Sequence, residues 1–95
     1  MDKPEIAVFG AGAWGTALAM AWARQGTRVA LWGHPVATMR ELRTTGRHPR
    51  LPEAVLPPTV HPHDEPDALF DAPIWISALP TQISPEVWTQ RLLPL

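Results

Sequence analysis

The sequence predicts an α/β fold, a Rossmann-like parallel sheet with flanking helices, truncated to its first three or four strands. Short apolar runs rich in β-forming residues recur along the chain, and segments of strong helix formers separate them. The first two apolar runs stop at Gly10 and Gly33. Two buried strands joined by a helix imply a right-handed crossover, so we expect the strands to be parallel.

The first part of the chain is expected to form a strand, a turn, a helix and a second strand. Residues 5–9 are a short apolar run that suits a strand buried on both faces. A glycine turn follows at 10–15, and residues 16–25 are strong helix formers that precede Gly26, a residue suited to end a helix. Residues 28–32 form the second apolar strand.

The middle of the chain is expected to hold a second helix and an irregular connection. Pro35 suits the first position of a helix, with Val36, Met39 and Leu42 on its apolar side. Residues 46–66 contain six prolines, which predict an irregular path after this helix.

The last part of the chain is expected to consist of short elements. We expect a very short strand at 59–60, a short helix that Asp64 caps and that runs to Phe70, and a clear strand at 74–79. A final helix is expected at 84–92. Because another parallel strand would follow such a helix, we expect the chain to be the N-terminal piece of a longer protein.

The composition excludes several classes of protein. The 95 residues include no cysteine, which excludes a disulfide scaffold, a thiolate metal site and a cysteine nucleophile. The net charge of −1 lacks the basic surplus of a nucleic-acid binder. The uncharged run at 6–23 follows no positive n-region and is broken by glycines, so we expect no membrane span and a cytoplasmic protein.

The turn at 10–15 has the G-x-G-x-x-G spacing of dinucleotide-binding sites. In this motif Gly10 would allow the tight turn, Gly12 would let the backbone approach a pyrophosphate, and Gly15 would permit close packing of helix on strand. The helix that follows offers free N–H groups and the positive end of its dipole to the phosphates. Glycines that merely form a turn are the alternative, but the position between a strand and a helix favours a dinucleotide site.

The residues after the second strand bear on the choice between NAD and NADP. An acidic residue there would bind the ribose 2′-hydroxyl of NAD, yet no acidic residue occurs from Ile6 through Arg40. A 2′-phosphate would meet no repulsion and could contact His34 or an arginine. We therefore expect NADP or NAD as cofactor, with NADPH favoured. Taken one by one, Arg40, Arg43 and Arg47 are expected to form a solvated helix face.

Further segments have a more specific pattern than the glycines alone. Residues 8–19 contain a Trp-Gly-Thr-Ala run inside the glycine motif. Leu-Trp-Gly-His follows at 31–34, Leu-Pro pairs at 51–52 and 56–57, and Leu-Pro-Thr-Gln at 79–82. These segments, spread along the whole chain, closely resemble the NAD(P)-dependent glycerol-3-phosphate dehydrogenase family.

The resemblance implies cofactor contacts for additional residues. Ala13 and Trp14 would contact the dinucleotide through the glycine turn, and His34 and Pro35 would flank its adenosine end. Arg50 stands where the family usually has an aromatic residue, and an arginine there could stack on adenine or reach a phosphate. For Trp14, simple packing at the start of the helix stays open as an alternative.

The resemblance also implies a reaction, a reversible hydride transfer between NAD(P)H and dihydroxyacetone phosphate that gives sn-glycerol 3-phosphate for phospholipid synthesis. No catalytic residue of the family maps onto this chain. Residues 1–95 would therefore be the N-terminal portion of an NAD(P)-binding Rossmann domain, without the C-terminal substrate domain and inactive alone. In the full-length protein we expect a small phosphorylated substrate as a partner, and a homodimer stays open.

Two other functions stay open as alternatives. The chain could be the cofactor domain of another Rossmann reductase, of the ketopantoate or 3-hydroxyacid type, or a non-catalytic dinucleotide-binding module.

The His-Pro-His-Asp sequence at 61–64 is interpreted as a polar turn with an Asp cap, because a metal site would need further ligands. Trp75 is expected to lie in the core.

Overall fold

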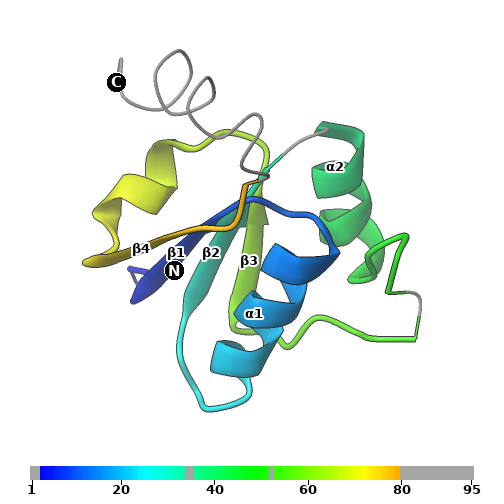
Figure 1. Ribbon diagram of the computed structural model, residues 1–95, viewed down its shortest axis with the longest axis horizontal. Helices are drawn as coiled ribbons and strands as arrows, with labels where there is room; N and C mark the ends of the chain where they lie inside the picture. Colours follow the sequence, from blue (N-terminus) through cyan, green and yellow to red (C-terminus); the bar gives the residue numbers. More distant parts are fainter. Residues whose placement is uncertain (1–2, 34–35, 52, 80–95) are drawn as a thin grey trace.

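The computed structural model describes residues 3–33, 36–51 and 53–79 of the protein. These residues form a four-stranded sheet with helices on both faces (Figure 1), which confirms the predicted α/β class. In chain order the elements are β1 (Ile6–Phe9), α1 (Ala13–Ala23), β2 (Val29–Trp32), α2 (Val36–Thr45), β3 (Val60–His63), the 3-10 helix η1 (Asp67–Asp71) and β4 (Ile74–Ser77).

The sheet has the strand order β3-β2-β1-β4, and all its strand pairs are parallel, as predicted. Phe9 at the end of β1 is level with Trp32 of β2 and with Ser77 of β4. Trp32 is in turn level with His63 of β3. The carboxyl ends of all four strands therefore meet at one edge, which is where open parallel sheets bind their ligands.

Alternate residues of β1 point to opposite faces of the sheet and contribute to two apolar clusters. Ala7 and Phe9 pack in a cluster with Leu69 of η1. Val8 packs in the other cluster, with Ala19 of α1 and further residues of both helices. The two α-helices thus cover one face of the sheet, and η1 covers the other (Figure 1).

The helix α1 begins at Ala13 rather than at Thr16 as predicted. The N–H of Thr16 already donates to the carbonyl of Gly12 at 3.0 Å, so the second half of the glycine motif is wound into the helix. The helix ends close to the predicted place, where Gly26 donates its N–H to the carbonyl of Ala23 at 2.9 Å.

The uncharged run at 6–23 is divided between a strand, a turn and a helix. The first residues of the run form β1, and its last eleven residues form α1. Within the described part of the chain, no helix combines the length and the apolar character that a membrane crossing requires.

The helix α2 buries two of the three residues of its predicted apolar side, and the side chain of the third, Val36, lies outside what the structure describes. Met39 and Leu42 are fully buried against the sheet, whereas Arg40 and Arg43 are exposed. The helix start expected at Pro35 lies outside the described residues, and so does the final helix expected at 84–92.

The His-Pro-His sequence is part of a strand, so the prediction of a polar turn is wrong. β3 runs from Val60 to His63 and pairs with β2, whereas the sequence predicts only a very short strand at 59–60. Pro62 has no N–H for a sheet hydrogen bond, and it is tolerated because β3 has, within the described part of the chain, a neighbouring strand on one side only.

Asp64 does not cap a helix, contrary to the prediction. The helix that follows is a 3-10 helix whose N-cap is Pro66, with no side-chain hydrogen bond at the cap. Asp64 Oδ2 instead pairs with Arg43 Nη1 at 3.0 Å, and its backbone carbonyl accepts the indole N–H of Trp32 at 3.1 Å. Asp64 therefore ties the end of β3 to α2 and β2.

β4 lies at an edge of the sheet among the described residues, and its side chains are partly exposed. Ile74 is 51% exposed and Trp75 is 46% exposed, so the prediction that Trp75 lies in the core is wrong. Its ring does pack edge-on against Phe70, with ring centroids 5.1 Å apart. The side chains of a parallel strand are buried only where other elements cover both faces of the sheet. An apolar run in the sequence does not show whether such elements are present.

Replacing Gly15 with alanine should destabilise the fold, because α1 approaches the end of β1 too closely for a side chain. A Cβ at Gly15 would collide with the carbonyl oxygen of Gly10, whereas a Cβ at Gly12 would meet no atom within 4 Å. We expect Gly15→Ala to lower the free energy of unfolding by about 3 kcal/mol, and Gly12→Ala by less than about 1 kcal/mol. Urea denaturation without cofactor measures both values, and equal losses would contradict the packing argument.

Candidate dinucleotide-binding site

The glycine turn between β1 and α1 is closed at two of its glycines and open at the third. Gly10 has a φ of +125°, and a Cβ there would lie 2.6 Å from the carbonyl carbon of Ala78. Gly15 packs against the carbonyl of Gly10. Gly12, in contrast, is exposed and would place a Cβ in open space. A ligand can therefore approach the backbone of the turn at Gly12.

The N-terminus of α1 is not capped by a side chain. Its N-cap residue is Gly12, and no acidic residue lies in the first turn of the helix. The N–H groups of Ala13, Trp14 and Gly15 have no partner within the helix, because the helical hydrogen bonds begin at Thr16. A helix terminus of this kind carries a partial positive charge and favours phosphate groups.

The end of β2 packs directly against the glycine turn. The N–H of Gly10 donates to the carbonyl of Trp32 at 2.6 Å. A Cβ at Gly33 would collide with the backbone nitrogen of Ala11. The sequence predicts only the end of a strand at Gly33, whereas in the structure its lack of a side chain lets β2 and the turn touch.

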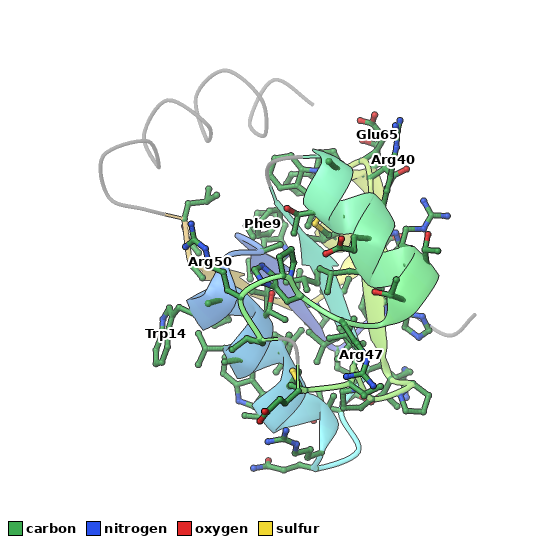
Figure 2. The ribbon with its side chains drawn as sticks, turned by 90° about the vertical axis from the view of Figure 1, so that its right-hand side faces the viewer. Phe9, Trp14, Arg40, Arg47, Arg50 and Glu65 are labelled. Carbon is green, nitrogen blue, oxygen red and sulfur yellow. The ribbon has the colours of Figure 1, made fainter. Side chains whose placement is uncertain are left out.

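Trp14 lies on the first turn of α1 and is 69% exposed. Its side chain points away from the body of the molecule in Figure 2. Among the residues that the structure describes, Trp14 is therefore not packed against the fold, contrary to the alternative of simple packing at the helix start. Its contact with a dinucleotide stays a prediction.

Arg50 lies in the connection between α2 and β3 and is exposed. Figure 2 shows Arg50 and Trp14 on the same side of the molecule, towards the N-terminal end of α1, while Arg40 lies on the opposite side of the view. His34 and Pro35 lie outside the described residues. The predicted site residues that the structure brings to this end of α1 are Gly10, Gly12, Ala13, Trp14, Gly15 and Arg50.

The structure adds His48 to this region, a residue that the sequence patterns do not single out. His48 is only 6% exposed. Its Nε2 lies 2.8 Å from the carbonyl oxygen of Ala11, and its Nδ1 lies 3.0 Å from the backbone nitrogen of Arg50. Ala11 and His48 are 37 positions apart, so no local spacing indicates this contact.

Histidines and arginines also occur outside the glycine turn. No group of three or more histidines or acids in the described residues is arranged to hold a metal ion. Arg40 and Arg43 are exposed on α2, as the solvated helix face predicts, and Arg43 pairs with Asp64. Arg47 is also exposed, but it lies beyond the end of α2, so its place on the helix face was predicted wrongly. His63 is half-buried, and its Nε2 has no hydrogen-bond partner among the described residues.

The strand, turn and uncapped helix match a known family of proteins. A family model described as NAD-dependent glycerol-3-phosphate dehydrogenase N-terminus matches residues 5–93. The chain belongs to this family. The match includes all the described strands and helices, and it confirms the resemblance seen in the sequence. An NAD- or NADP-dependent dehydrogenase family supports the expected class of cofactor.

Individual relatives support the same assignment. A glycerol-3-phosphate dehydrogenase (NAD(P)+) of Thioalkalivibrio sulfidiphilus is 44% identical over 98 residues, covering 99% of this chain and 28% of that protein. The enzyme of the same name from Acidiphilium cryptum is 46% identical over 79 residues, covering 83% of this chain and 24% of that protein.

A solved structure is also similar. The crystal structure of glycerol-3-phosphate dehydrogenase from Coxiella burnetii matches with a TM-score of 0.86 and 35% identity. The match covers 98% of this chain and 29% of that one. The chain thus spans less than a third of the length of these relatives.

Burial of His63 should make the stability of this edge of the sheet depend on pH. Burial lowers the pKa of His63 from its usual 6.5, the charges of His61 and Arg43 lower it further, and Asp64 opposes them. The folded protein therefore binds a proton at His63 less readily than the unfolded chain does. The contribution of His63 to the free energy of unfolding is therefore fully present above pH 6.5 and is lost as the pH decreases below this value.

Thermal melting at several pH values checks this expectation. Between about pH 7.5 and 5.5 we expect the protein to lose more stability than the variant His63→Asn, which has no imidazole to titrate. The same pH dependence in both proteins would contradict the assigned role of His63.

Proposed function

We propose that the glycine turn and the N-terminus of α1 bind the pyrophosphate of NADP or NAD. The open backbone at Gly12, between the closed glycines 10 and 15, is the observation that carries this proposal. A phosphate that approaches Gly12 meets the N–H groups at the start of α1, which have no helical partner. The cofactor-binding residues in this proposal are Gly10, Gly12, Ala13, Trp14, Gly15, His34, Pro35 and Arg50.

In the complete protein this site would serve hydride transfer between NAD(P)H and dihydroxyacetone phosphate, with sn-glycerol 3-phosphate as product. The nicotinamide supplies the hydride when bound, and the residues of this chain bind and orient the dinucleotide. The family match and the names of the relatives support this reaction. Residues 1–95 would form the N-terminal portion of the NAD(P)-binding domain, and the catalytic residues would come from other parts of the protein.

NADPH is the favoured cofactor in this proposal. An acidic side chain after β2 would bind the 2′-hydroxyl of NAD, but β2 is followed by Gly33 and His34, and no acid occurs from Ile6 through Arg40. The exposed Arg50 near the start of α1 adds positive charge on the side of the turn. These features favour an additional phosphate.

Gly12→Val should abolish NADPH binding and leave the fold intact. The backbone at Gly12 has φ −69° and ψ −175°, which valine adopts without strain, and no atom lies within 4 Å of the added Cβ. The valine side chain then fills the space that a pyrophosphate needs. We expect the affinity for NADPH to fall by a factor of about a hundred or more, with little change in melting temperature. Fluorescence titration of the complete gene product measures the affinity, and an unchanged value would refute the placement.

Steady-state assays of the complete gene product test the substrate. We expect turnover of dihydroxyacetone phosphate and a higher kcat/KM with NADPH than with NADH. We expect no turnover by residues 1–95 alone, because no catalytic residue of the family maps onto them and the reaction needs a positioned acid or base. Turnover of ketopantoate or a 3-oxoacid instead would identify the cofactor domain of another reductase. NADPH binding without turnover of any substrate would indicate a non-catalytic module.

A further inference from the structure

His48 links the connection between α2 and β3 to the glycine turn. A carbonyl oxygen only accepts hydrogen bonds, so Nε2 of His48 donates to Ala11 at 2.8 Å. A backbone N–H only donates, so Nδ1 accepts from Arg50 at 3.0 Å. The neutral imidazole with its proton on Nε2 satisfies both contacts. Because His48 is nearly buried, loss of either partner would leave a polar atom unpaired, which costs free energy.

The carbonyl that His48 holds lies inside the glycine turn. It belongs to the peptide group that joins Ala11 to Gly12, the residue whose backbone is open to a ligand. On the other side of the same residue, the Ala11 nitrogen packs against Gly33. The hydroxyl of Thr16 also reaches the Ala11 carbonyl, but at 3.4 Å, which is a long hydrogen bond. Of these two side chains, His48 therefore makes the shorter contact with the carbonyl.

The same ring holds the backbone from which Arg50 projects. The N–H of Leu51 donates to the carbonyl of His48 at 3.0 Å, and these two residues form an isolated antiparallel bridge. The tight turn between them presents Arg50 to solvent, towards the N-terminal end of α1 (Figure 2). A guanidinium held in this place can pair with a phosphate group of a ligand at the turn.

We infer that His48 is a positioning residue for the dinucleotide, which keeps the Ala11–Gly12 peptide and Arg50 in one arrangement around the phosphates. The inference rests on the proposed function, because it requires a dinucleotide at the glycine turn. A histidine that only fills the core would change stability when replaced and leave the affinity for the cofactor unaltered.

Two conservative variants separate the two contacts of the ring. Glutamine at this position can extend its amide N–H to Ala11, but its acceptor oxygen then lies beside that N–H at the end of the side chain and not at the place of Nδ1, which accepts the Arg50 N–H. Asparagine can accept that N–H, as in a turn of Asx type, but is too short to reach Ala11. In the complete gene product we expect His48→Asn to raise the KM for NADPH about tenfold and His48→Gln about threefold. The kcat and the KM for dihydroxyacetone phosphate should stay the same.

A double-mutant cycle with Arg50→Ala tests the link between the two residues. When the Arg50 side chain is absent, the position of the backbone at residue 50 no longer affects cofactor binding. We therefore expect His48→Gln to have almost no further effect on the KM for NADPH in the Arg50→Ala variant. An equal effect of His48→Gln in both backgrounds would overturn the inference. This cycle does not depend on His48→Asn, so it decides the question even if that variant fails to fold.

The variant Gly12→Val distinguishes failure of this inference from failure of the proposed function. If Gly12→Val binds NADPH normally, the glycine turn is not the cofactor site and both proposals fail. If Gly12→Val loses NADPH binding while His48→Asn and His48→Gln keep the KM of the unaltered protein, the cofactor site stands and only the role of His48 is overturned.

Discussion

The contact between backbone segments at the carboxyl edge of the sheet is the constraint on which the rest of this structure depends. Gly10 lies against the backbone of Ala78 after β4, Gly15 brings α1 against Gly10, and Gly33 brings the end of β2 against Ala11. None of these contacts leaves room for a Cβ atom. The ends of three strands and the start of α1 are therefore held together at one place, and the helix N-terminus points to the edge where ligands bind.

This packing also explains why Gly12 is accessible. The turn is held by its neighbours, so the exposed backbone at Gly12 and the N–H groups of Ala13 and Trp14 keep one arrangement without a side-chain cap. Pre-formed donors bind an anion without a further cost of ordering. His48 extends this arrangement to the proline-rich connection, because its two ring nitrogens join Ala11 to the turn that presents a basic side chain.

The sequence predicts the elements whose residues share a strong local pattern. β1 and β2 are apolar runs that end at glycines, and Met39 and Leu42 have the spacing of a buried helix face. The predictions fail where contacts between distant residues decide. Asp64 has the residue type of a helix cap, but its ion pair with Arg43 and its contact with Trp32 place it at the end of a strand. β4 is apolar enough for a central strand, yet among the described residues it has a neighbour on one side only.

By itself the sequence determined the fold class, the glycine spacing and the family to which the chain belongs, since all three depend on residue types at short and regular distances. The motif already assigned an open position to Gly12 and close packing to Gly15, and the tertiary structure decided which backbone atoms close Gly10, Gly15 and Gly33. It also decided that His48 lies beside a turn 37 positions earlier in the chain. The physical reason is that close backbone approach and burial of a polar ring depend on elements that the sheet brings together. A local sequence pattern does not show which distant elements will be in contact.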